Sequence, residues 1–185
     1  QDIGGLEKDI SKTYFESGLT CTMGANHKAT YTDSKDRVWE GMPLWFLAGF
    51  VDDADQHSND AFNNELAAAG YQVVITAADG YSVTIDSADI IRNNDYIIAN
   101  SLNGALIPES DSNWPLRLVG PAVTGTTSIS QIVRIELVST GPAGPIYTVT
   151  PGADTAYTPG KTSEGINTMT VNDGSSGFKY FEVSI

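Results

Sequence analysis

The chain is short of basic residues, cysteine and long apolar runs, and each shortage excludes a class of protein. It has 10 Lys and Arg against 23 Asp and Glu, for a formal net charge of −13. No Lys/Arg run supplies the positive patch that a nucleic-acid-binding or anionic-membrane-binding face needs, so we expect no nucleic-acid partner. One cysteine, Cys21, excludes an intrachain disulfide. No apolar stretch reaches the roughly 18 residues of a transmembrane helix, so we expect no transmembrane segment.

What the chain does contain indicates a strand-rich globular protein. Its 185 residues, 41% of them hydrophobic, are enough for one full core with a small appendage. Gly, Ser, Thr, Asn and Asp are frequent, and helical patterns are few. We therefore predict an α+β fold of mostly antiparallel strands with few short helices and many turns.

The first half of the chain is expected to hold the helices. Residues 2–12 have a short helical pattern, and residues 13–23 alternate as a strand. Residues 24–37 are polar and predict a surface loop. A turn at residues 39–43 leads into an apolar helix that has Pro43 at its first position. The acidic loop of residues 51–64 is expected to end in a short helix capped by Asn59 or Asp60.

The second half is expected to hold the strands. Residues 71–77 and 81–85 flank Ala78-Asp79-Gly80, and Asp-Gly between two β-rich runs is a strong hairpin signal. Ser87 is predicted to cap a short helical turn. Further strands are expected at residues 95–100, 114–119 and 130–138, with a tight turn at Asn103-Gly104.

A Gly/Pro-rich segment divides the chain. We predict a first domain over residues 1–139, a linker over residues 140–145 and a small C-terminal β segment over residues 146–185. About forty residues are marginal for an independent core. The tail therefore either packs on the first domain or is the cut end of a longer β module, and the second is favoured because the chain stops inside an alternating apolar run.

Cys21 and His27 are the first candidates for a site. A thiolate next to a cation is a nucleophile and a soft metal ligand, whereas an unreactive cysteine is a small buried residue on a strand. His27 is either a metal ligand and proton carrier or a loop histidine in water. The acidic loop with Asp52, Asp53, Asp55 and Asp60 lacks EF-hand spacing, and a solvated loop is favoured over a calcium site.

Six short motifs occur in order along the chain: Leu19-Thr-Cys21, Trp39-Glu-Gly-Met-Pro-Leu44, Asp79-Gly-Tyr-Ser-Val83, Leu102-Asn-Gly-Ala-Leu106, Trp114-Pro-Leu-Arg-Leu-Val119 and Val133-Arg-Ile-Glu-Leu137. In this order they resemble the molybdopterin-binding domain of sulfite-oxidase-like oxidoreductases, over residues 1–139. The resemblance implies that family's α+β fold and a molybdenum–pterin cofactor. It implies that Cys21 is the thiolate ligand of the metal.

The resemblance also implies which other residues face the cofactor. It places His27 beside Cys21 as a second candidate metal ligand. Lys28, Tyr81, Ser82 and Ser128 complete the cofactor-binding set that we predict from the family's motifs.

The chain resembles more closely the form of this domain found as modules in archaeal surface and secreted proteins. That form combines a Cys-Thr-Met-Gly start, a following histidine, an acidic loop and the string Trp114-Pro-Leu-Arg-Leu-Val-Gly120. The resemblance implies an extracellular or cell-surface location. Its partners would be a small-molecule ligand or other modules of the same surface protein.

The sequence differs from the enzymes of this family at two motifs, and two hypotheses about its function therefore stay open. The enzymes have a Gly-Asn-Arg-Arg type run after the thiolate and Gly-x-Lys-Ser-x-Lys near the last strand. Here the same places read Gly24-Ala-Asn-His-Lys28 and Gly125-Thr-Thr-Ser-Ile-Ser130, so most of the cations are missing. One hypothesis is a domain that binds the cofactor through Cys21 for oxo or electron transfer. The other is a cofactor-free structural, adhesion or ligand-binding surface module, so enzymatic activity stays open.

Overall fold

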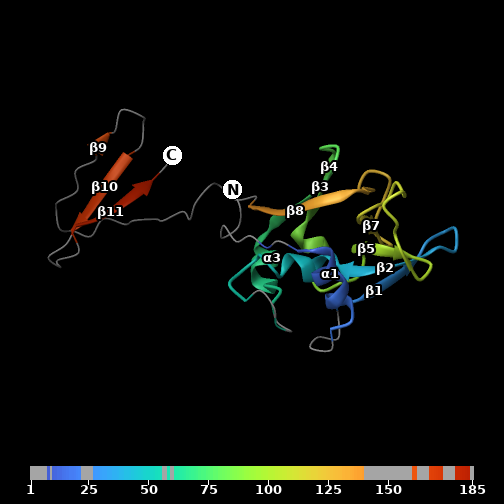
Figure 1. Cartoon of the computed structure of the whole chain (residues 1–185). Coiled ribbons are helices and arrows are strands. Elements are labelled where there is room, and N and C mark those ends of the chain that lie inside the picture. Colours follow the sequence, from blue (N-terminus) through green and yellow to red (C-terminus); the bar gives the residue numbers. More distant parts are fainter. Residues whose placement is uncertain are drawn as a thin grey trace. The chain divides into compact units, whose positions relative to one another are not determined.

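The structure is a computed structural model that describes residues 8, 10–21, 27–55, 58 and 61–139, together with three strands at 160–161, 167–172 and 178–183. The chain divides into two compact units, Gln1–Gly144 and Pro145–Ile185. The described part of the first unit contains two sheets and a few short helices (Figure 1).

The larger sheet contains β1 (Ala29–Thr32), β2 (Val38–Pro43), β5 (Ile97–Leu102), β6 (Ala105–Leu106) and β7 (Arg117–Val119). Its order is β1-β2-β5-β6, and β7 also pairs with β5. The smaller sheet has the order β4-β3-β8, from β3 (Tyr71–Ala77), β4 (Ser82–Asp86) and β8 (Ile132–Ser139). Every pairing is antiparallel, which confirms the predicted α+β fold of mostly antiparallel strands.

Short helices complete the first unit. They are α1 (Lys12–Leu19), α2 (Leu44–Ala48), α3 (Asn64–Ala69) and the 3₁₀ turn η1 (Ser87–Asp89). None of the described helices has the length and apolar character to cross a membrane.

The second unit is described only as three strands. They are β9 (Gly160–Lys161), β10 (Asn167–Asn172) and β11 (Phe178–Val183), in the antiparallel order β11-β10-β9.

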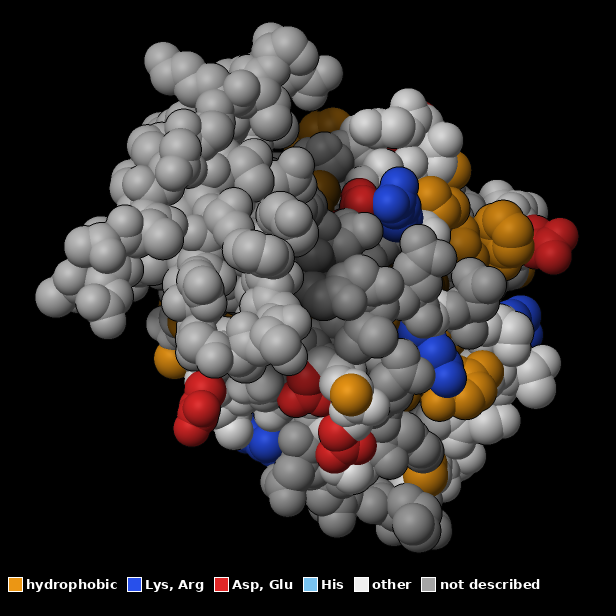
Figure 2. Space-filling model, turned by 90° about the vertical axis from the view of Figure 1, so that its left-hand side faces the viewer, with side chains coloured by type: hydrophobic (Ala, Val, Ile, Leu, Met, Phe, Trp, Pro, Cys, Tyr) orange, Lys and Arg blue, Asp and Glu red, His pale blue; other side chains and the backbone are white. Residues whose placement is uncertain are grey.

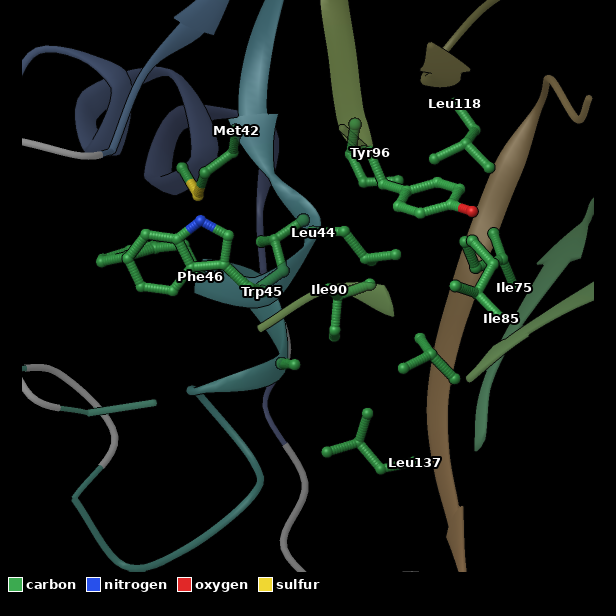
Figure 3. Close-up of a cluster of buried hydrophobic side chains, with 14 of the residues drawn as sticks. Met42, Leu44, Trp45, Phe46, Ile75, Ile85, Ile90, Tyr96, Leu118 and Leu137 are labelled. Atoms are coloured by element: carbon green, nitrogen blue, oxygen red, sulfur yellow. The ribbon is translucent and has the colours of Figure 1, made fainter. Parts of the chain in front are cut away.

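The main core fills the space between the two sheets. In Figure 3, Met42, Trp45 and Phe46 project from β2 and α2 on one side. Ile75, Ile85 and Leu137 project from the smaller sheet on the other side, and Leu44 and Ile90 lie between them. All five residues of α2 are buried. Burial of this apolar area supplies most of the stabilisation of the unit.

β5 is buried on both faces, unlike β3. In β3 buried and half-buried residues alternate, because one face meets the core and the other does not. In β5, Ile98 joins the main core whereas Ile97 and Ala99 join a second cluster with Trp39 and Val119. This explains the nearly continuous apolar run at the start of β5.

Several predicted elements differ from the structure in the first half of the chain. The predicted strand over residues 13–23 is wrong, because residues 12–19 form helix α1. The Ser11 side chain caps this helix by accepting a hydrogen bond from the Tyr14 N–H at 3.1 Å, and Lys12 pairs with Glu16 one turn later. The predicted helix over residues 2–12 lies largely outside the described residues.

Three further corrections concern local structure. The polar segment of residues 24–37 contains strand β1, and residues 39–43, predicted as a turn, belong to β2. Helix α3 is capped by Asn63, whose side chain accepts from the Leu66 N–H at 2.9 Å. Ser87 is buried and does not cap; its hydroxyl donates to the Ala67 carbonyl and accepts from the Tyr71 N–H.

Candidate functional site

A groove of about 810 Å³ runs beside α1. Ser11, Lys12, Phe15 and Glu16 line it from the helix, and the end of α2 and strand β8 line it from the other sides. Its lining includes three exposed apolar side chains: Leu106, Trp114 and Val133. A groove of this size and mixed lining is typical of a small-molecule or cofactor site.

A smaller pocket of about 290 Å³, which we call the recess, continues the groove toward the far end of α1. The two pockets share Glu16, Asn100 and Leu106. The remaining lining of the recess comes from the end of α1 and from the larger sheet: Leu19, Thr20, Lys28, Glu40, Ser101 and Gly104. Groove and recess together therefore follow the whole length of α1, about 12 Å.

Two polar residues of β5 face the recess with buried atoms that lack a partner. Asn100 and Ser101 are each 7% exposed. Asn100 Oδ1 and Ser101 Oγ have no hydrogen-bond partner in the described part of the protein. A buried polar atom without a partner costs about 1–3 kcal/mol, so a ligand that supplies the missing bonds would be favoured here.

A β-bulge explains why two neighbouring side chains reach the same pocket. Along a regular strand Asn100 and Ser101 would point to opposite faces. In the pairing of β2 with β5, Glu40 is opposite Ser101 but Gly41 is opposite Ala99, so Asn100 is the extra residue. Bulges re-aim side chains and are frequent next to functional sites.

The cations around these pockets are engaged by carboxylates or rings. Lys12 pairs with Glu16 one turn along α1. Lys28 Nζ lies 2.7 Å from Glu40 Oε2, and Arg134 Nη2 lies 2.6 Å from Glu136 Oε1. Lys8 lies over the Tyr14 ring at 5.2 Å. An anion entering the recess would have to compete with Glu40 for Lys28, the one cation of its described lining.

Cys21 lies directly after α1 and belongs to the described lining of neither the groove nor the recess. The C-cap residue Thr20 lines the recess, and the backbone N–H of Cys21 donates to the Gly18 carbonyl at 3.1 Å. Its side chain is half-buried. The thiol therefore follows a helix, not a strand.

His27 is buried, so the alternative of a loop histidine in water is wrong. Its side chain is 4% exposed and meets the Phe46 ring edge-on, with 4.0 Å between ring centroids. Lys28, the next residue, lines the recess. Within the described ranges no three His, Cys, Asp or Glu residues gather as a metal-binding cluster.

Tyr81, Ser82 and Ser128 lie elsewhere. Tyr81 and Ser82 are exposed in the β3–β4 hairpin of the smaller sheet. Ser128 Oγ accepts a hydrogen bond from Arg117 Nη2 at 3.3 Å, and the Arg117 guanidinium lies over the Trp39 ring. None of the three belongs to the described lining of the groove or the recess.

Sequence reasoning missed Glu16, Glu40, Asn100 and Ser101 as site residues. One signal was present, because Asn100-Ser101 interrupts an otherwise apolar strand. Nothing in the sequence marked the bulge that turns both side chains to one pocket.

The acidic loop contains a buried carboxyl. Asp52 is 4% exposed, and its Oδ2 accepts from the Asn63 N–H at 2.7 Å. Burial raises the pKa of this carboxyl to about 6, with a smaller contribution from the neighbouring charge of Asp53. Asp53 accepts from the Asp55 N–H and the Asn63 side chain, so both carboxyls organise the entry to α3. The prediction of a wholly solvated loop is wrong for Asp52.

Comparison with known proteins supplies the family. A search of curated proteins found no match. The family model of the oxidoreductase molybdopterin-binding domain matches residues 12–146, which include α1, both sheets, the recess and the lining of the groove except Lys8, Ile10 and Ser11. Since this match covers most of the chain, the protein belongs to the family of oxidoreductase molybdopterin-binding domains.

Proposed function

We propose that this domain binds a molybdenum–pterin cofactor in the groove along α1, with the Cys21 thiolate as the protein ligand of the metal, and that it acts in oxo or electron transfer. The observation that carries the proposal is the groove itself, since its continuation ends beside Thr20, the residue before Cys21. Family membership supports the cofactor class.

The residues present fit such a group. The groove has room for a bicyclic ring system, and its apolar wall includes Phe15, Leu47 and Ile107. Lys8, Lys12 and Arg134 also line it, and they offer donors for a phosphate although the family's lysine motif is missing. These cations come from α1, the segment before it and β8.

The roles of the chain's own residues follow from their positions. The bound cofactor would supply the redox chemistry, and the protein would orient and tune it. Cys21 would hold the metal, and Lys28 would face the same end of the site. His27 would hold or move a proton at a ring nitrogen in a water-poor environment. The proposal gives no role to Tyr81, Ser82 or Ser128.

The test is metal and pterin analysis of protein produced with molybdate supplied. We expect near-stoichiometric molybdenum and pterin in the wild type and loss of molybdenum in Cys21→Ser. Ser82→Ala is the matched control and should retain both. Tryptophan fluorescence should show that both variants are folded. Equal molybdenum in Cys21→Ser and wild type would reject Cys21 as the ligand.

The second candidate function is a cofactor-free module of an extracellular or cell-surface protein that acts in adhesion, architecture or ligand binding. It is favoured by the pairing of Lys12 and Lys28 with carboxylates, which leaves few donors for an anionic cofactor. Wild-type protein without molybdenum or pterin, together with an unchanged fold of Cys21→Ser, would support it.

A further inference from the structure

We propose that the recess binds a small neutral or cationic molecule that donates hydrogen bonds, such as a primary amine, and that it disfavours oxyanions. If the proposed function is right, this ligand represents the class of molecule on which the domain acts, and only that interpretation rests on the proposed function. Binding itself can be measured with or without molybdenum.

The first reason is the type of atom left without a partner. Asn100 Oδ1 is buried and can only accept a hydrogen bond, and Ser101 Oγ both accepts and donates. A deprotonated oxyanion has acceptors only, so it cannot satisfy Asn100 Oδ1. A molecule with two N–H or O–H groups satisfies both atoms.

The second reason is the charge next to these atoms. Glu40 is the direct cross-strand partner of Ser101, so the two side chains lie on the same face of the sheet. Glu16 adds a second carboxylate to the lining, whereas Lys28 is the single cation of the described lining and is held by Glu40. Glu16 is paired with Lys12, so each carboxylate already has one cation but keeps further acceptor positions. The described lining therefore offers a hydrogen-bond donor more partners than it offers an anion.

The third reason is the apolar part of the recess. Leu106 is the other cross-strand partner of Ser101, and Leu19 lines the recess from the end of α1. Leu106 is 49% exposed, and Gly104 beside it has no side chain to obstruct entry. A short alkyl group attached to the donor would contact both leucines.

The test uses four-carbon molecules that differ only in the polar group. Full-length ¹⁵N-labelled protein is titrated with butylammonium, butanol, butyrate and, separately, sulfite, and amide shifts of Lys28, Asn100, Ser101 and Gly104 are followed by NMR. We expect saturable shifts with butylammonium and weaker binding of butanol. Butyrate and sulfite should bind more weakly by roughly tenfold or more, because they leave the buried acceptor Asn100 Oδ1 unsatisfied. Molybdenum content is measured on the same samples.

Three variants and one control locate the binding. Asn100→Ala and Ser101→Ala should each weaken butylammonium binding by about 5- to 20-fold. Glu40→Gln should weaken butylammonium and strengthen butyrate, because it also releases Lys28. Asn93→Ala, between β4 and β5 and outside both pockets, should bind as the wild type does.

The outcomes separate this inference from the cofactor proposal. If the protein contains no molybdenum but binds butylammonium, the proposed ligand site in the recess is supported and only the cofactor proposal is rejected. Any one of three results would overturn the inference. Butyrate or sulfite binds as tightly as butylammonium or more tightly, Asn100→Ala and Ser101→Ala both bind as the wild type does, or these amides show no saturable shifts. Loss of pterin in Asn100→Ala would assign the recess to the cofactor and also overturn it.

Discussion

At Gly41 the backbones of β2 and β5 lie very close together, next to the bulge at Asn100. A Cβ atom built there would lie 2.0 Å from the Ile98 carbonyl oxygen and 2.5 Å from Ala99 Cα. Backbone atoms cannot move away as a flexible side chain can. The close approach therefore requires glycine at this position.

We predict that Gly41→Ala lowers the free energy of unfolding by at least about 2 kcal/mol, because it forces the two strands apart. Gly125→Ala is the matched control, since an added Cβ there meets no atom within 4 Å. It should change stability by less than about 0.5 kcal/mol. Urea denaturation followed by tryptophan fluorescence measures both; equal stabilities of the two variants would contradict the predicted clash.

The raised pKa of Asp52 leads us to predict that the stability of the protein depends on pH. Its folded-state pKa of about 6 exceeds the ordinary value of 3.8 because the carboxyl is buried. Between these values the folded state binds more protons than the unfolded state, so stability falls as pH rises from about 4 to 6 and then levels off. The loss is on the order of 2–3 kcal/mol.

Asp52→Asn should remove this contribution, since an amide can still accept from the Asn63 N–H. We expect a flatter stability profile between pH 4 and 6 and a more stable variant at pH 7. Asp86→Asn, at an exposed position, is the control and should keep the wild-type slope. Urea midpoints across pH measure the effect, and an unchanged slope in Asp52→Asn would exclude Asp52 as its source.

At the scale of elements, α1 is where local sequence was most misleading. Its residues Lys12–Leu19 include Thr, Tyr and Phe, which favour strands, and a glycine near the end. The helix forms because Ser11 caps it, Lys12 and Glu16 pair along one side and Phe15 reaches the main core. Since α1 borders both pockets, its stability matters for the site.

We predict that Ser11→Ala destabilises the protein by about 1 kcal/mol through loss of the cap. Ser11→Asp should restore most of this stability, because aspartate also accepts the Tyr14 N–H. Ser17→Ala makes the same substitution at an exposed position within the helix and should be neutral or slightly stabilising. Thermal melts would contradict the cap if Ser11→Ala and Ser17→Ala behaved alike.

The β3–β4 hairpin is the opposite case, because its local sequence was sufficient to predict its structure. Val73 and Ile75 on β3 face Ile85 and Val83 on β4 in register, and the turn has Gly80 at φ +87°. The alternation and the Asp-Gly turn specify this pairing without any distant contact.

For the whole molecule, the first unit contains its own two sheets and core. On the face shown in Figure 2, the acidic and basic side chains of the described residues are interspersed, so the net charge of −13 does not form one acidic patch there. All three tryptophans, Trp39, Trp45 and Trp114, lie in this unit.

We predict that a chain ending at Gly144 folds by itself. Its melting temperature should equal that of the tryptophan-reported transition in the full chain within about 2 °C, a shift of well under 1 kcal/mol. Near-UV circular dichroism and tryptophan fluorescence measure this, with the full chain as control. A non-cooperative melt of the shorter chain would show that residues 145–185 are needed for folding.

The sequence by itself determined the fold class, the hairpin and the turn at Asn103-Gly104, because these depend on local patterns and ordered motifs. It also indicated Cys21, His27 and Lys28 as site residues, and their roles stay a prediction. The tertiary structure decided that residues 12–19 are helical and that His27 is buried against Phe46. It also decided that Asn100 and Ser101 face one recess with Glu40. That arrangement depends on a bulge between strands whose paired residues, Glu40 and Ser101, are far apart in sequence, and local propensity carries no information about such contacts.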